Sequence, residues 1–99
     1  MTEEKNNTKE NIVFIGSKPF MNYVTGVVMQ FTTKNADIVS IRSRGKFISK
    51  AVDVAEVVRN RFLGDQGVIV KDIKIGSEAF VTKDGKDVNV STIEILLSK

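Results

Sequence analysis

The sequence predicts an α+β fold, a two-layer sandwich in which two helices cover one face of a four-stranded mixed sheet. Short β-prone apolar runs alternate with segments whose apolar residues recur at helical spacing, which gives the element order βαβαββ. The 99 residues suffice for one core and are too few for two domains. Hydrophobic residues make up 41% and charged residues 27% of the chain, which is typical of an ordinary globular protein.

The first eleven residues are expected to form a disordered leader, and residues 12–99 the folded domain. The leader is polar, has no apolar periodicity and is unlike a secretory signal. No apolar run approaches the roughly 20 residues that a membrane span needs. The chain contains no cysteine, which fits an intracellular protein without proving one. We therefore expect a cytoplasmic protein with no membrane partner.

The first half of the domain is predicted to be a strand, a helix and a second strand. Ile12–Ile15 is a compact β-prone run, and Pro19 then stands where the first turn of a helix tolerates proline. One apolar stripe marks the helix that follows: Phe20, Val24, Val27, Val28 and Phe31. The second strand is predicted over Asp37–Ile41, and a basic loop over Arg42–Lys46 follows it.

The second half is predicted to be a helix and a hairpin. Gly64 stops a helix whose apolar stripe contains Ile48, Ala51, Val52, Ala55, Val58 and Phe62. Two further strands, Val68–Ile75 and Val88–Leu97, are joined through Thr82–Lys86, whose Asp-Gly pair suits a tight turn.

Some apolar residues are left over from these stripes. Val54 and Val57 fall outside the stripe of the second helix. In the last strand Ile93, Ile95 and Leu97 share one face, and the other face carries Val90, Thr92, Glu94 and Leu96. The leftover positions could form a self-association surface, although scattered surface apolar residues explain the same pattern.

The composition argues against an enzyme. Without histidine or cysteine the chain cannot build a Ser-His-Asp site, a Cys-His site or a His/Cys metal site. Asp53 and Glu56 lie one helical turn apart but alternate with Lys50 and Arg59 at ion-pairing spacing, which favours a salt-bridged helix face. We expect no catalysis, cofactor or metal. The enzymatic alternative is a small enzyme that acts on a phosphorylated ligand through carboxylates or through the loop around Lys18.

Positive charge is concentrated in residues 42–62, which suggests a site that binds phosphate. Residues 42–62 contain six basic and two acidic side chains. Arg42, Arg44 and Lys46 leave a predicted strand at alternate positions, which projects them to one side, and a parallel first strand would bring Lys18 beside them. Arginine's planar fork suits phosphate. The alternative is a solvated basic loop.

Two further segments carry weaker signals. The turn Gly16–Pro19 lies at a helix N-terminus, where backbone N–H groups beside a lysine attract phosphate, although such a turn is more often a plain connection. Lys83 and Lys86 flank the tip of the hairpin, and a two-stranded ribbon can follow a nucleic-acid groove.

Three sequence blocks together resemble the Alba family of small archaeal chromatin proteins. They are IVFIGSKPFMNYV, IRSRGKFISKAVDVAEVVRNRF and VNVSTIEILLSK, and the resemblance extends from Asn11 to Lys99. It implies a fold similar to the C-terminal domain of translation initiation factor three, and a homodimer. It also implies binding of double-stranded DNA and RNA with little sequence preference, in a chromosome-associated protein that coats or compacts archaeal DNA.

The resemblance also implies roles for individual residues. The nucleic-acid contacts would be Ser17, Lys18, Arg42, Arg44 and Lys46, with Lys83 and Lys86 on arms that reach for the minor groove. Contact between neighbouring dimers on DNA would involve Arg59, Asn60 and Phe62, although Phe62 also completes a predicted core stripe. Many family members carry two lysines in the first loop, so Ser17 in place of the first should weaken phosphate attraction.

Two other functions fit the same sequence. RNA could be the main partner, in a ribonucleoprotein or translation-related role, because the basic loops serve an A-form helix equally well. The chain lacks the runs of stacking aromatics that bind single strands, which points to duplex or structured RNA. A protein-interaction module that uses the leftover apolar face is the third hypothesis.

Overall fold

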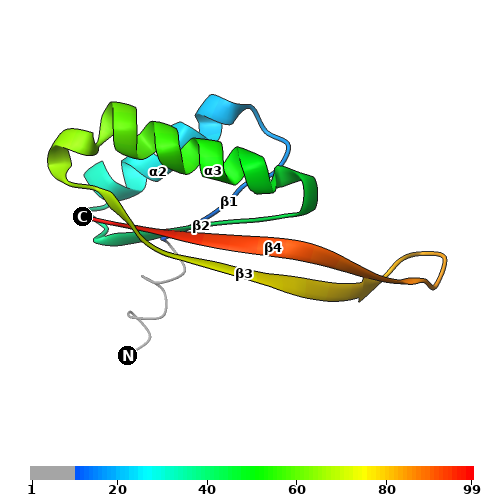
Figure 1. The fold of residues 1–99 in the computed structure, drawn as a ribbon. Helices are drawn as coiled ribbons and strands as arrows, with labels where there is room; N and C mark the ends of the chain where they lie inside the picture. The colour runs from blue at the N-terminus through cyan, green and yellow to red at the C-terminus, as the bar shows by residue number, and fades with distance from the viewer. Residues whose placement is uncertain (1–10) are drawn as a thin grey trace.

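The computed structural model describes residues 11–99 and confirms the predicted fold class and the order βαβαββ (Figure 1). The main elements are β1 (Ile12–Phe14), α2 (Phe20–Thr32), β2 (Ile38–Arg44), α3 (Ile48–Val57), β3 (Ile69–Val81) and β4 (Asp87–Ser98). The predicted leader lies outside the described residues except for Asn11, whose carbonyl accepts a 2.9 Å hydrogen bond from the Ser40 N–H.

The sheet is mixed and has the strand order β1-β2-β4-β3. β1 pairs with β2 in parallel, and β4 runs antiparallel to both β2 and β3. Both helices lie on one face of the sheet, as predicted (Figure 1). The other face, called here the outer face, carries no helix in the part of the chain that the structure describes.

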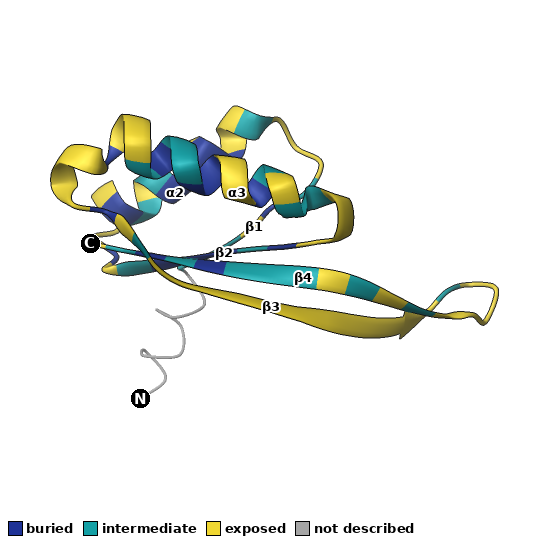
Figure 2. Cartoon of the chain, viewed as in Figure 1, coloured by how far each residue is buried: buried dark blue, intermediate teal, exposed yellow. Residues whose placement is uncertain are grey.

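The core lies between the sheet and the helices (Figure 2). Alternate residues of β2 and β4 point toward the helices, because successive side chains of a strand face opposite sides. The buried strand residues are Val39, Ile41, Ile95 and Leu97, and α2 contributes Tyr23, Val24, Val27 and Phe31. The predicted stripe of the first helix is confirmed, with Phe20 and Val28 partly buried at its margins.

β2 continues three residues beyond its predicted end at Ile41, so Arg42 and Arg44 belong to a strand and not to a loop. Residues 42–44 pair with Glu94, Ile93 and Thr92 of β4, and the two arginines lie on the solvent-facing outer face. Gly45, with φ of 59°, ends the strand and turns the chain toward α3.

The hairpin of β3 and β4 is longer than predicted. β3 runs to Val81 instead of ending at Ile75, because pairing with β4 outweighs the low strand propensity of Gly76. Thirteen residues at about 3.3 Å each make β3 roughly 40 Å long, and the far part of the hairpin projects past the helices as an arm in Figure 1. Thr82–Lys86 forms the tip as predicted, where the Thr82 N–H donates to the Lys86 carbonyl at 2.9 Å.

The helix α3 ends in a π turn, Val58–Phe62, which changes the residue that enters the core. The Leu63 N–H donates to the Val58 carbonyl at 2.9 Å, a bond that spans five residues instead of four. Leu63 is buried as a result, and Phe62 is 48% exposed. The alternative in which Phe62 completes the core stripe is therefore wrong, because the wider turn shifts the stripe by one residue.

The inward face of α3 also differs from the predicted stripe. Val54 is fully buried and Val57 packs partly buried against the core, whereas Val52 is 40% exposed. A helix that contacts both the sheet and a second helix buries a broader stripe than one line of residues. Val54 and Val57 therefore do not form the self-association surface that the sequence suggested.

Val54→Asp should lower the free energy of unfolding by more than about 3 kcal/mol, because it buries an unpaired charge. The matched control is Val52→Asp on the exposed face of α3, which changes helix propensity equally and should cost less than about 1 kcal/mol. Urea unfolding followed by circular dichroism measures both. Similar losses in the two variants would contradict the observed orientation of α3.

Candidate nucleic-acid interface

The loop between β1 and α2 is held from inside by a tyrosine. The hydroxyl oxygen of Tyr23 accepts hydrogen bonds from the N–H groups of Gly16 and Lys18, each at 3.0 Å. Pro19 has no N–H to offer. An internal acceptor thus already uses the N–H groups of Gly16 and Lys18, which agrees with the plain connection that such a turn more often forms. Ser17 and Lys18 are both exposed, and the ammonium of Lys18 remains as the charge of this loop.

The second basic segment begins at the same end of the sheet. Phe14, the last residue of β1, is in register with Arg42, two residues before the end of β2, and the Ile15 N–H donates to the Arg42 carbonyl at 2.8 Å. Lys46 lies in a 3-10 turn, Gly45–Phe47, with its ammonium 5.4 Å from the centre of the Phe47 ring. The connections from β1 to α2 and from β2 to α3 thus leave the sheet at one end, as Figure 1 shows.

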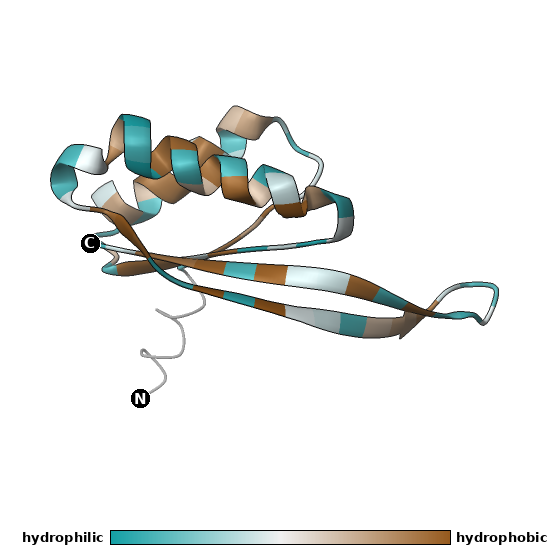
Figure 3. Ribbon diagram, viewed as in Figure 1, coloured by the Kyte–Doolittle hydropathy of each residue, from teal (hydrophilic) through white to brown (hydrophobic). Residues whose placement is uncertain are grey.

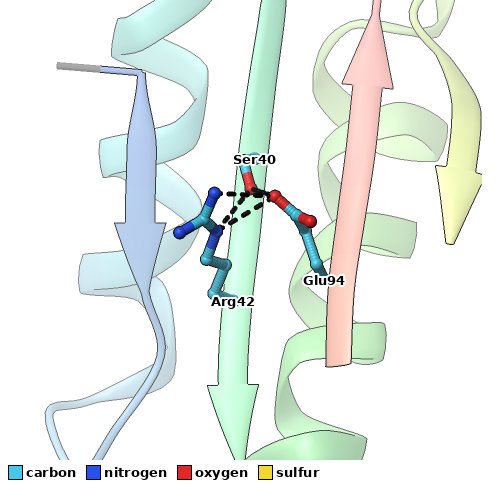
Figure 4. A network of polar contacts seen from close by, with 3 residues as sticks. All are labelled: Ser40, Arg42 and Glu94. Carbon is cyan, nitrogen blue, oxygen red and sulfur yellow. Dashed lines mark hydrogen bonds and ion pairs between the residues drawn. The ribbon is translucent and has the colours of Figure 1, made fainter. Parts of the chain in front are cut away.

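Arg42 is anchored on the outer face of the sheet in a network with Ser40 and Glu94 (Figure 4). Its Nε donates to Ser40 Oγ at 3.1 Å and to Glu94 Oε2 at 3.0 Å, and its Nη2 lies 2.9 Å from the same carboxylate oxygen. Ser40 Oγ donates to that oxygen at 2.7 Å. The hydrogen bond from Ser40, and next the bond and charge of Arg42, hold the pKa of Glu94 below its ordinary value of 4.5.

Arg44 is held less firmly. Its Nη1 lies 3.2 Å from Glu78 Oε1, and both side chains are more than half exposed. An exposed ion pair of this kind is worth little in water, so a phosphate can compete for the guanidinium. Arg44 lies on the same side of the sheet as Arg42, at the rim of an open depression of about 570 Å³ that Phe14, Lys74 and Thr92 also line.

Lys83 and Lys86 are exposed at the tip of the hairpin, far along the arm from the two loops. The arm is exposed on nearly all of β3, so neither strand face is packed against the helices there (Figure 2). The two lysines are therefore carried away from the body of the protein, in positions suited to reaching a distant part of a ligand.

The opposite end of α3 carries Arg59, Asn60 and Phe62. Arg59 Nε donates to Glu56 Oε2 at 2.7 Å, and this bond lowers the pKa of Glu56 and raises that of Arg59. Asn60 Nδ2 donates to Glu56 Oε1 at 3.4 Å. The predicted salt-bridged face is confirmed for Glu56 with Arg59. A Cβ at Gly64 would lie 2.8 Å from the Arg59 carbonyl, so the chain must turn there without a side chain.

Sequence reasoning missed the residues that organise the charges. The residue spacing predicted no role for Tyr23, and it placed Asp53 at ion-pairing distance from Lys50. Its ammonium instead contacts the carbonyls of the first loop. Glu78 and Glu94 lie 34 and more residues from their arginine partners along the chain, so only the strand register reveals the pairs.

No helix within residues 11–99 is long and apolar enough to span a membrane. In the same range, no group of three or more acidic side chains is arranged to hold a metal ion.

Comparison with known proteins identifies relatives over nearly the whole chain. Residues 11–77 match the family model described as Alba. The DNA/RNA-binding protein Alba of Methanothrix thermoacetophila is 56% identical over 92% of this chain and 98% of its own. DNA/RNA-binding protein Alba 1 of Archaeoglobus fulgidus is 57% identical over 91% of this chain and 97% of its own. The structure of Alba from Thermoplasma volcanium superimposes with a TM-score of 0.81 at 48% identity, covering 90% of this chain and all of that one.

Glu94→Gln should destabilise the protein by about 1 kcal/mol at neutral pH, because it removes a charged acceptor from Ser40 and Arg42. The folded protein holds the pKa of Glu94 below 4.5, so its contribution is present above that pH and is lost as the pH falls through the lower folded value. The difference in unfolding free energy between wild type and variant should therefore shrink as the pH falls below 4.5.

Urea unfolding across this pH range measures the effect, with Glu78→Gln as the control. Glu78 is half exposed in a surface ion pair, so its replacement should change stability by less than about 0.5 kcal/mol. A Glu94→Gln effect that stays constant with pH would show that the carboxylate charge is not its cause.

Proposed function

The chain belongs to the Alba family, and we propose that it is a non-catalytic protein that binds double-stranded DNA and RNA as a homodimer. The observation that carries this proposal is the position of Lys18 and Lys46 in two loops that leave the sheet at one end, beside Arg44. The naming of its relatives as DNA/RNA-binding proteins supports the same ligand class.

The proposed mechanism is electrostatic. Lysine and arginine side chains of the two loops would replace counterions on the phosphate backbone, which makes affinity fall as salt rises. Contacts to phosphate carry no sequence information, so binding would be largely independent of sequence. The net charge of only +3 and Ser17 in the first loop both favour moderate affinity.

The arginines would contribute unequally. Arg44 exchanges an exposed carboxylate for a phosphate at small cost, whereas Arg42 would have to leave two partners on the sheet. We therefore assign the stronger phosphate contacts to Lys18, Arg44 and Lys46, with Arg42 as a supporting contact. The hairpin arms, tipped by Lys83 and Lys86, would follow a groove and respond to its width.

A second copy of the chain would cover the apolar part of the arm. Ile73 and Ile75 point to the helix side of the sheet, in register with Ile95 and Ile93, yet β3 lies beyond the helices and leaves them 55% and 83% exposed. β3 is also an edge strand of 13 residues, which a protein normally protects. Figure 3 shows brown, hydrophobic bands on both β3 and β4. A dimer formed there would double the basic loops and spread two arms.

Assembly beyond the dimer would use Phe62. The π turn exposes this ring at the end of α3 opposite the basic loops, so it would be available while the loops hold DNA. Dimers that meet through Phe62, flanked by Arg59 and Asn60, would coat or compact a chromosome. A cytoplasmic, chromosome-associated location follows from this role. The alternative is that RNA is the main partner in the cell.

Anisotropy titration of a labelled DNA duplex and the equivalent RNA duplex, at several salt concentrations, tests the proposal. Log affinity should fall linearly with log salt for both ligands. In a dimer, Lys18→Ala/Arg44→Ala removes four phosphate contacts, so the slope should decrease by roughly 3 to 4. A strong preference for RNA would favour the ribonucleoprotein alternative.

The matched control is Lys34→Ala/Lys99→Ala, which removes the same charge at the opposite end of the sheet, where β2 begins and β4 ends. It should change the slope by less than about 1. Equal effects of the two double variants would show that binding depends only on net charge, and no binding by wild type at low salt would reject the proposed function.

Replacing either of two exposed apolar residues with aspartate should distinguish the dimer interface from the contact between dimers. Ile75→Asp should convert the free protein to monomer in analytical ultracentrifugation, whereas Phe62→Asp should leave the free dimer intact. Phe62→Asp should instead reduce cooperative binding to DNA of several hundred base pairs, seen as a lower Hill coefficient. An unchanged mass for Ile75→Asp would place the dimer interface elsewhere, and undiminished cooperativity in Phe62→Asp would reject that contact.

A further inference from the structure

The ammonium of Lys50 is directed at the backbone of the loop between β1 and α2. Lys50 lies in the first turn of α3 and is half-buried. Its Nζ donates to the carbonyl of Gly16 at 2.8 Å and to the carbonyl of Lys18 at 2.6 Å. The side chain therefore joins the start of α3 to the loop between β1 and α2, across 32 residues of sequence.

Two aromatic rings surround this ammonium. Nζ lies 5.1 Å from the centre of the Tyr23 ring and 5.8 Å from that of Phe47, within the range of cation–π attraction. Two carbonyl oxygens and two ring faces satisfy a charge that would otherwise be costly to withdraw from water. The surroundings of Lys50 Nζ therefore stabilise its positive charge.

Tyr23 and Lys50 hold complementary groups of the same two residues. Tyr23 accepts from the N–H groups of Gly16 and Lys18, and Lys50 donates to their carbonyls. The backbone of the loop also lies close to the Tyr23 side chain, since a Cβ at Gly16 would lie 3.4 Å from the Tyr23 hydroxyl oxygen. Four hydrogen bonds from two side chains therefore fix both backbone groups on either side of Ser17.

We propose that Lys50 is a positioning residue for nucleic-acid binding: together with Tyr23 it holds Gly16–Lys18 in the conformation that presents the Lys18 ammonium to phosphate. The inference rests on the proposed function, because it concerns the same contact. Lys50 is one of the six basic residues between Arg42 and Phe62, yet it acts on the loop and not on the ligand. An ordered loop spares the complex the entropy of fixing Lys18 on binding.

Two variants test the role by removing different partners of the loop. Tyr23→Phe removes the shared acceptor and leaves every charge in place, and Lys50→Met removes the ammonium but keeps an apolar side chain of similar length. In both, we expect amide hydrogen exchange at Gly16 and Lys18 to accelerate at least about tenfold. Affinity for the DNA duplex should fall by nearly the factor seen for Lys18→Ala.

The controls separate positioning from charge and from folding. Lys34→Met removes an equal charge far from the loop and should leave the exchange rates of Gly16 and Lys18 unchanged. Lys50→Arg keeps a cation that can donate to both carbonyls and should recover most of the affinity. Thermal unfolding of each variant shows whether the rest of the fold is intact, and Tyr23→Phe serves if Lys50→Met is too unstable.

The double variant Lys18→Ala/Lys50→Met decides between positioning and direct contact. If Lys50 acts through Lys18, the double variant should bind with the affinity and salt slope of Lys18→Ala alone. A further loss of affinity and a further decrease of the slope by about 1 per chain would make Lys50 a phosphate contact and overturn the inference. Full affinity in Tyr23→Phe despite faster exchange would overturn it as well. Absence of binding by wild type would instead reject the proposed function, and the exchange rates would still test the hold on the loop.

Discussion

The parallel pairing of β1 with β2 is the constraint on which the arrangement of this protein depends. Only three residue pairs join the two strands, from Ile12 with Ser40 to Phe14 with Arg42. Because parallel strands end at the same side of a sheet, the loop that carries Lys18 and the turn that carries Lys46 begin next to each other. The crossover through α2 also places Tyr23 beneath the first loop. A single short ladder thus places two basic connections, which carry Lys18 and Lys46, at the same end of the sheet.

Carboxylates restrain the positive charge of this region. Glu94 and Ser40 anchor Arg42, Glu78 meets Arg44, and Glu56 meets Arg59. The ammonium of Lys50 donates hydrogen bonds to two carbonyls of the loop between β1 and α2. The six basic side chains of residues 42–62 therefore range from cations held by the protein to cations that a ligand can reach. The exposed pairs of Arg44 and Arg59 contribute little to stability, so their guanidinium groups remain available to a ligand.

Exposed apolar groups complement the charges. The π turn at the end of α3 places Leu63 in the core and Phe62 in solvent, and the length of β3 carries Ile73 and Ile75 beyond the helices. A single chain leaves all three side chains about half exposed or more. Phe62 and the isoleucines lie on different elements, so the contacts proposed for them would not compete for the same surface.

The sequence by itself determined the fold class, the order of the elements and the identity of the basic residues, because hydrophobic periodicity and turn residues are local properties of the chain. It predicted the tip of the hairpin at Thr82–Lys86 and the pairing of Glu56 with Arg59, which both depend on near neighbours. It also carried the three blocks that resemble the Alba family. Features that depend on residue spacing within one element could therefore be predicted from the sequence.

The tertiary structure decided how each of those residues is used. The extension of β2 and β3 depends on pairing with β4, and the burial of Val54 depends on packing against the sheet and α2. The π turn, which moves Phe62 out of the core, breaks the very periodicity from which its burial was predicted. Arg42 with Glu94, and Lys50 with the carbonyls of Gly16 and Lys18, are contacts between distant segments. Strand register and helix packing create them, and no local pattern encodes either.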